Sequence, residues 1–155
     1  MPDIPLKLSL EEFRSRAAEG NLVPVYAEMA ADYETPLSAF NKISDGKHAF
    51  LLESAEHADQ VGRYSFVGSK PRAVIEARGT AVKITEGEEV REFESESGDP
   101  LRDLEEFMAR FDPVADPALP LFYGGAVGYL AYDAVRYVER LPQRPTDDRG
   151  LPEML

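Results

Sequence analysis

Two short stretches of the chain carry residues that could bind a small polar ligand. Glu53 and Ser54 close an apolar run, and Arg63 and Tyr64 lie one loop further along. If the two stretches form neighbouring strands, a carboxylate, a guanidinium, hydroxyl groups and an aromatic ring meet at one strand end. Such a grouping could bind an amino acid, with the carboxylate on the arginine or hydroxyl donors and the ammonium group on Glu53. An apolar side chain would then rest against Leu52 or Tyr64.

The same residues also have a purely structural interpretation. Glu53 and Arg63 could form an ordinary cross-strand ion pair at the end of a sheet. Other chemistries find less support. His48 and His57 lack the spacing of a metal-binding pair, no G-x-S-x-G motif presents Ser54 as a nucleophile, and the chain has no cysteine. Residue types alone therefore favour a binding or regulatory role over a stand-alone enzyme.

Composition limits the partners that such a role could involve. The chain has 155 residues, 43% of them apolar, and a formal net charge of −12 at pH 7. This size predicts one domain over residues 1–155, and this acidity argues against nucleic-acid or anionic-membrane partners. No apolar run approaches the roughly 20 residues of a membrane helix, and the first residues do not resemble a signal peptide. We therefore expect a soluble cytoplasmic protein.

Capping signals predict three helices that would support these residues. Ser9 with Glu12 forms a capping box for a helix over about residues 9–19, with Gly20 as its stop. Thr35-Pro36 and Asp99-Pro100 each read as an N-cap followed by proline at the first helical position. The helix after Asp99 has the longest apolar stripe, which extends to Phe111.

Between and after these helices the sequence predicts strands. The run over 49–54 has the pattern of a strand buried on both faces, and the segment over 22–29 that of an edge strand, because Pro24 cannot donate to a ladder. Glycine-bounded segments predict an antiparallel meander over 62–68, 73–77, 80–84 and 89–93, and a glycine-interrupted strand over 121–130. Gly124, Gly125 and Gly128 there fit close backbone approach better than a nucleotide loop. The expected fold class is α+β, with antiparallel sheets and helices packed on one face.

Several of these segments together resemble the amino-terminal region of anthranilate synthase component I, a chorismate-using enzyme of tryptophan biosynthesis. The first is Leu51-Leu52-Glu53-Ser54 followed by residues 62–68, which read GRYSFVG. Residues 35–43, TPLSAFNKI, and 124–133, GGAVGYLAYD, with the RYVE that follows, match further motifs of that family in the family's order. Residues 151–154, LPEM, are similar to its segment just before the catalytic portion begins. The apolar end of the chain also suggests a cut inside a longer protein.

The resemblance implies a regulatory role for this chain. In the family, the Leu-Leu-Glu-Ser motif forms part of the tryptophan site for feedback inhibition, which implicates Leu52, Glu53 and Ser54. Arg63 aligns approximately with a basic residue of that site, with Tyr64 beside it. A Pro-x-Met segment of the catalytic half completes the family's site, and that half also holds the Mg²⁺ ligands and the chorismate-binding residues. This chain is therefore expected to carry no catalytic residue, metal or cofactor of its own and to be inactive alone.

For the complete protein, the resemblance implies conversion of chorismate to anthranilate and pyruvate, with ammonia from a glutamine amidotransferase subunit. Tryptophan would inhibit by binding one arrangement of the two halves more tightly than the other. The family fold is a four-layer α/β/β/α arrangement, of which this chain would be one half. Because that half would expose a sheet face, we predict that the chain alone self-associates, which a monomer by light scattering at high concentration would contradict.

Two alternatives remain open at this point. The chain could belong to another chorismate-using enzyme, such as aminodeoxychorismate synthase component I or a salicylate- or phenazine-type relative. It could also be a free-standing module that binds an amino acid. The intact LLES and RYSF strings favour the anthranilate branch.

Overall fold

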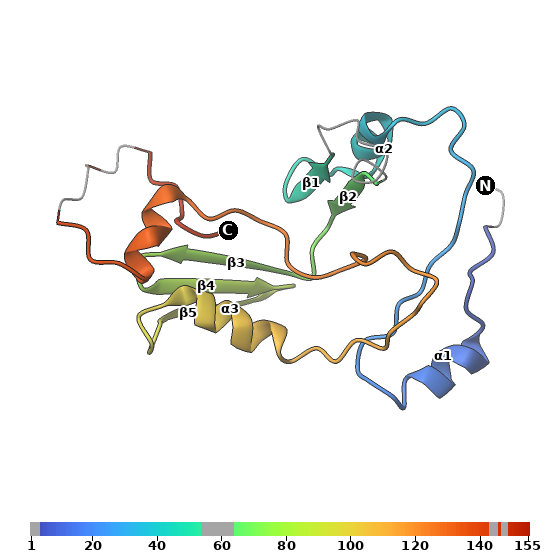
Figure 1. Ribbon diagram of the computed structural model, residues 1–155, viewed down its shortest axis with the longest axis horizontal. Helices are drawn as coiled ribbons and strands as arrows, with labels where there is room; N and C mark the ends of the chain where they lie inside the picture. The colour runs from blue at the N-terminus through green and yellow to red at the C-terminus, as the bar shows by residue number, and fades with distance from the viewer. Residues whose placement is uncertain (1–3, 54–63, 143–145, 147–148) are drawn as a thin grey trace. The chain divides into compact units, whose positions relative to one another are not determined.

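The computed structural model describes residues 4–53, 64–142, 146 and 149–155. These residues form helices and antiparallel strands, which confirms the α+β class (Figure 1). They divide into two compact units, one made of residues up to 30 with 95–126, the other of 31–94 with 127–155. The elements are α1 (Leu10–Arg16), α2 (Pro36–Ile43), β1 (Ala49–Leu52), β2 (Phe66–Ser69), β3 (Ala73–Arg78), β4 (Ala81–Glu86), β5 (Glu89–Glu94), α3 (Pro100–Met108) and the 3₁₀ helix η1 (Tyr132–Tyr137).

In the first unit, α1 begins at the predicted capping box but is shorter than predicted. The Ser9 hydroxyl accepts from the Glu12 N–H, and the Glu12 carboxylate accepts from the Ser9 N–H at 2.8 Å. The helix ends at Arg16, before Gly20. Gly20 instead allows a close backbone approach, because a Cβ there would lie 2.4 Å from the carbonyl oxygen of Asp112. Its lack of a side chain serves packing rather than helix termination.

An ion pair ties α1 to the connector that follows α3. The Arg16 guanidinium donates to the Asp116 carboxylate at 2.8 Å and to the Ala115 carbonyl at 2.7 Å. Both charged side chains are largely shielded from solvent. Two residues about 100 positions apart in the sequence are thereby held together within this unit.

The strand predicted over residues 22–29 is wrong. Only Leu22 forms a β-bridge, a parallel one with Pro113, in which Val114 donates to the Leu22 carbonyl at 2.9 Å. The ladder does not continue, and Pro24 has no N–H with which to extend it. A β-rich composition therefore did not make a strand here, because pairing stopped at the proline.

Helix α3 confirms the third predicted helix. The Asp99 side chain accepts from the Leu101 N–H at 3.1 Å, and Pro100 takes the first helical position. Phe107 is buried, and the Arg110 guanidinium lies 4.5 Å from the centre of its ring. The helix ends at Met108 rather than at Phe111, which packs edge-on against Phe107.

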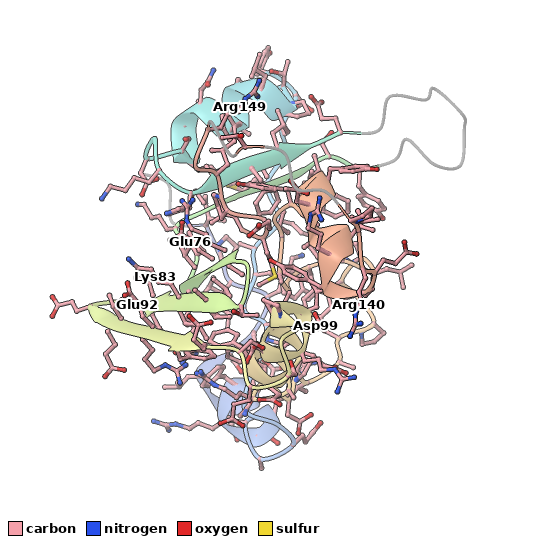
Figure 2. The ribbon with its side chains drawn as sticks, turned by 90° about the vertical axis from the view of Figure 1, so that its left-hand side faces the viewer. Glu76, Lys83, Glu92, Asp99, Arg140 and Arg149 are labelled. Atoms are coloured by element: carbon pink, nitrogen blue, oxygen red, sulfur yellow. The ribbon has the colours of Figure 1, made fainter. Side chains whose placement is uncertain are left out.

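In the second unit, β3, β4 and β5 form the predicted antiparallel meander. Val82 and Ile84 on one face of β4 are buried. On the other face, the register aligns Glu76, Lys83 and Glu92 across the three strands, and Lys83 pairs with Glu92 at 3.1 Å (Figure 2). The alternation therefore puts the buried side chains of β4 on one face of the sheet and a row of three charged side chains on the other.

Strands β1 and β2 form a separate two-stranded sheet that α2 contacts. The prediction that β1 is buried on both faces is wrong, since Ala49–Leu51 are half-buried and Leu52 is exposed. Likewise β2, predicted as part of the meander, pairs with β1 alone. The ring of Phe50 occupies the space above Gly68, where a Cβ would come within 2.3 Å of it. Glycine at this cross-strand position therefore lets an aromatic ring lie over the hairpin.

The strand predicted over residues 121–130 is also largely wrong. Only Leu130 forms a bridge, with Met154, and Gly125 has φ of 134°, a conformation that interrupts a regular strand. The predicted close backbone approach is confirmed at Gly128, where a Cβ would lie 1.8 Å from the carbonyl oxygen of Leu155. In the described part of the chain, no helix has the length and apolarity to cross a membrane.

Candidate functional site

The predicted site residues lie at the end of the β1–β2 hairpin where Leu52 pairs with Phe66 and residues 53–65 connect the two strands. The two strands pair antiparallel, with Ala49 opposite Ser69 and Leu52 opposite Phe66. One position beyond the last pair, the chain continues into Glu53 on one side and Ser65 on the other. The predicted pairing of neighbouring strands is therefore confirmed for residues 49–52 with 66–69, next to the predicted site residues.

An apolar surface lies at this end of the hairpin. Leu52 and Tyr64 are 47% and 49% exposed, and the rings of Tyr64 and Phe66 are in tilted contact with centroids 6.1 Å apart. Because Leu52 and Phe66 are cross-strand partners, their side chains leave the sheet on the same face. An aliphatic side chain and two aromatic rings are thus available to an apolar ligand.

The polar members of the predicted site are only partly described. Glu53 is exposed, directly after β1. Ser54 and Arg63 lie outside the described residues, and with them the alternative ion pair of Glu53 with Arg63. The structure therefore places Leu52, Glu53 and Tyr64 at one hairpin end, and the contributions of the other two residues stay predictions.

Helix α2 supports the β1–β2 hairpin. Its Thr35 hydroxyl accepts from the Ser38 N–H at 3.1 Å, and the Ser38 hydroxyl accepts from the Thr35 N–H at 2.9 Å. Lys42 forms an ion pair with Glu34. The pKa of the Glu34 carboxyl lies below its usual range, first because Lys42 donates to it and then because Ser38 does. These bonds fasten the loop before α2 to the helix that contacts both strands.

Sequence reasoning did not single out Phe66 and Phe50 as neighbours of the site. Phe66 carries the ring against which Tyr64 lies, and Phe50 covers Gly68 two positions along the same face. The period-two alternation of β2 was the available signal. Without the register, however, the partners across the hairpin could not be assigned.

The described residues offer no metal centre. No group of three or more His, Asp or Glu side chains within the described ranges is arranged to hold a metal ion. The Mg²⁺ that the resemblance implies was expected outside this chain.

Comparison with known proteins gives a consistent result. The chain is 44% identical to a protein named anthranilate synthase component 1 from Mycobacterium tuberculosis, over 99% of this chain. Proteins of the same name from Pseudomonas aeruginosa and Acetivibrio thermocellus are 42% and 40% identical, over 96% and 94% of this chain. The chain spans about 30% of the length of these curated relatives. No family model matches it.

Proposed function

We propose that this chain is the amino-terminal region of an anthranilate synthase component I and that it carries part of a tryptophan feedback-inhibition site. Identity of 40–44% that extends over nearly the whole chain supports the first part of the proposal. One structural observation carries the second part. The antiparallel register brings Leu52 and Glu53 to the same hairpin end as Tyr64.

The chemistry of that hairpin end suits the tryptophan zwitterion. Exposed Glu53 can accept hydrogen bonds from the ammonium group, while Arg63 and the Ser54 hydroxyl are the proposed donors to the carboxylate. Leu52 and Tyr64 would contact the indole, whose burial contributes about 25 cal/mol per Å² of apolar surface. Because both side chains are about half exposed in this chain, the proposed site needs a further wall from the longer protein.

For that longer protein we propose the reaction that the relatives' name indicates. It would convert chorismate to anthranilate and pyruvate with ammonia supplied by a glutamine amidotransferase, component II. The expected Mg²⁺ site, the four-layer α/β/β/α fold, the cytoplasmic location and the inactivity of this chain alone belong to the same proposal. They rest on the resemblance and on the relatives, whose length is about three times that covered here.

An inhibition assay on the full-length protein tests the proposal. Supplied with chorismate, ammonia and Mg²⁺, it should form anthranilate, detected by fluorescence, and tryptophan should suppress the rate. Leu52→Ala should raise the tryptophan concentration for half-inhibition at least tenfold, because it removes three carbon groups and each of them that the ligand buries contributes about 0.8 kcal/mol. Leu10→Ala, at a leucine exposed on α1, serves as the control.

Two results would overturn the proposal. If no anthranilate forms, the reaction is wrong, and a product of another chorismate-using enzyme would support the alternative branch. If Leu52→Ala and Leu10→Ala are inhibited at the same tryptophan concentration as the wild type, the hairpin end is not the effector site.

A further inference from the structure

Residues 153–155, which we call the strap, lie between two segments of the second unit. On one side, Ala77 of β3 donates to the Met154 carbonyl at 3.0 Å and accepts from the Glu153 N–H at 2.9 Å. On the other side, Tyr129 donates to the Leu155 carbonyl at 2.7 Å. The strap therefore acts as a middle strand that joins the meander to residues 129–131.

Side chains hold the strap in place as well. Met154 is 3% exposed, and the Glu153 residue is 9% exposed. The Glu153 carboxylate accepts from the N–H of Gly79, in the turn between β3 and β4, at 2.5 Å. Arg78 donates to the carbonyl of Gly150, just before the strap. A buried carboxylate that fastens a short segment to a turn makes the position of that segment specific.

The strap also depends on a missing side chain at Gly128. A Cβ at Gly128 would lie 1.8 Å from the Leu155 carbonyl oxygen. Because this oxygen is a backbone atom, it can move away only if the strap moves with it. Gly124, in the same loop, has no atom within 4 Å of the position of an added Cβ. The two glycines therefore provide a matched pair for testing the strap.

A short connection joins the β1–β2 hairpin to the strand that holds the strap. Only residues 70–72 separate β2 from β3. Pro71 restricts this link, and Arg72 donates to the Glu86 carboxylate at the end of β4 at 2.9 Å. Few rotatable bonds therefore separate β2 from β3.

We propose that the strap couples occupancy of the hairpin end to the rest of the longer protein, an inference that rests on the proposed function. The link at 70–72 connects the hairpin covalently to β3. Ala77 of β3 is in turn hydrogen-bonded to the strap. Coupling requires that the ligand bind one of two arrangements of the hairpin, β3 and the strap more tightly than the other. Loosening the strap should leave tryptophan binding intact and uncouple it from activity.

The test compares Gly128→Ala with Gly124→Ala in the full-length protein. For each variant, tryptophan affinity is measured by calorimetry, and residual activity is measured at saturating tryptophan. Gly128→Ala should bind tryptophan within about threefold of the wild type but retain most of its activity at saturation. Gly124→Ala should bind and be inhibited like the wild type. Glu153→Ala, which removes the contact with Gly79, should behave like Gly128→Ala and covers the case in which Gly128→Ala does not fold.

The outcomes separate the two proposals. If the wild type neither binds tryptophan nor is inhibited by it, the proposed function fails and takes this inference with it. If the wild type is inhibited and the folded strap variants are inhibited as completely, the strap has no part in coupling, while the effector site stands. Loss of tryptophan binding in the strap variants alone would also overturn the inference, because the strap would then belong to the binding site.

Discussion

Arg16 and Asp116 show how single side chains form contacts that no local sequence pattern predicts. Each is an ordinary charged residue in the sequence, yet their ion pair joins α1 to a distant connector. The pKa of the Asp116 carboxyl lies below its usual range, mainly because Arg16 donates to it and next because the Ala118 N–H does. The pKa of Arg16 is raised by the same hydrogen bond.

This pair gives the stability of the chain a pH dependence with a definite sign. Because the pKa of Asp116 is lower in the folded state, its contribution is full above the unfolded-state pKa, near 4, and is lost as the pH falls through the folded-state value. Asp116→Asn should therefore be less stable than the wild type at pH 7, and the difference should shrink toward pH 3. Urea unfolding at both pH values measures this. A difference that is the same at both would contradict the assignment.

The candidate site shows what could be predicted for individual residues. The sequence alone placed Glu53 directly after a strand, as the structure has it, and Tyr64 on the neighbouring strand, which in fact begins only at Phe66. It could not show that Tyr64 lies against Phe66, because that contact depends on side-chain directions at the end of a strand. The roles of Ser54 and Arg63 stay predictions.

Among the elements, those defined by local signals were the easiest to predict. The helices begin at Ser9, Thr35 and Asp99, whose side chains cap the following turn. The meander follows from alternation and from the two glycines between its strands, both of which have positive φ. Such signals reside in a few neighbouring residues and do not depend on the rest of the chain.

Elements that require a distant partner were predicted poorly. The segments at 22–29 and 121–130 have strand-like compositions, but each forms only one bridge, to Pro113 and to Met154 respectively. A strand exists only where a ladder continues, and Pro24 and the glycines near 125 end these ladders early. Nothing local in the sequence indicates that residues 153–155 supply the partner of 129–131.

Helix α2 provides a test of how one element supports another. Thr35→Ala removes the hydroxyl that accepts from Ser38 and should lower the free energy of unfolding by about 1 kcal/mol. Since α2 contacts both β1 and β2, the loss should appear in the hairpin as faster amide exchange. Urea unfolding and hydrogen exchange measure these effects. Thr35→Ser keeps the hydroxyl, so an equal loss in that variant would contradict the capping role.

For the whole molecule, the relatives and the structure lead to one account. The chain matches about 30% of the length of anthranilate synthase component 1 proteins, and its β1–β2 hairpin presents an acidic, partly apolar end to solvent. In the account proposed above, the chain would supply one wall of an effector site and the strap that couples it to the remainder. The net charge of −12 does not attract the carboxylate of a ligand, so nearby donor groups must bind that carboxylate.

The most direct test of this account is calorimetry of tryptophan binding to the full-length protein, comparing the wild type with Ser54→Ala and with Ser44→Ala. Ser44 is a turn serine after α2 whose hydroxyl accepts from the Gly46 N–H, so it controls for the loss of a hydroxyl. We predict that Ser54→Ala weakens binding about tenfold, because a hydrogen bond to a charged group contributes about 1.5–3 kcal/mol. Ser44→Ala should bind like the wild type. Equal affinity in all three proteins would contradict the account.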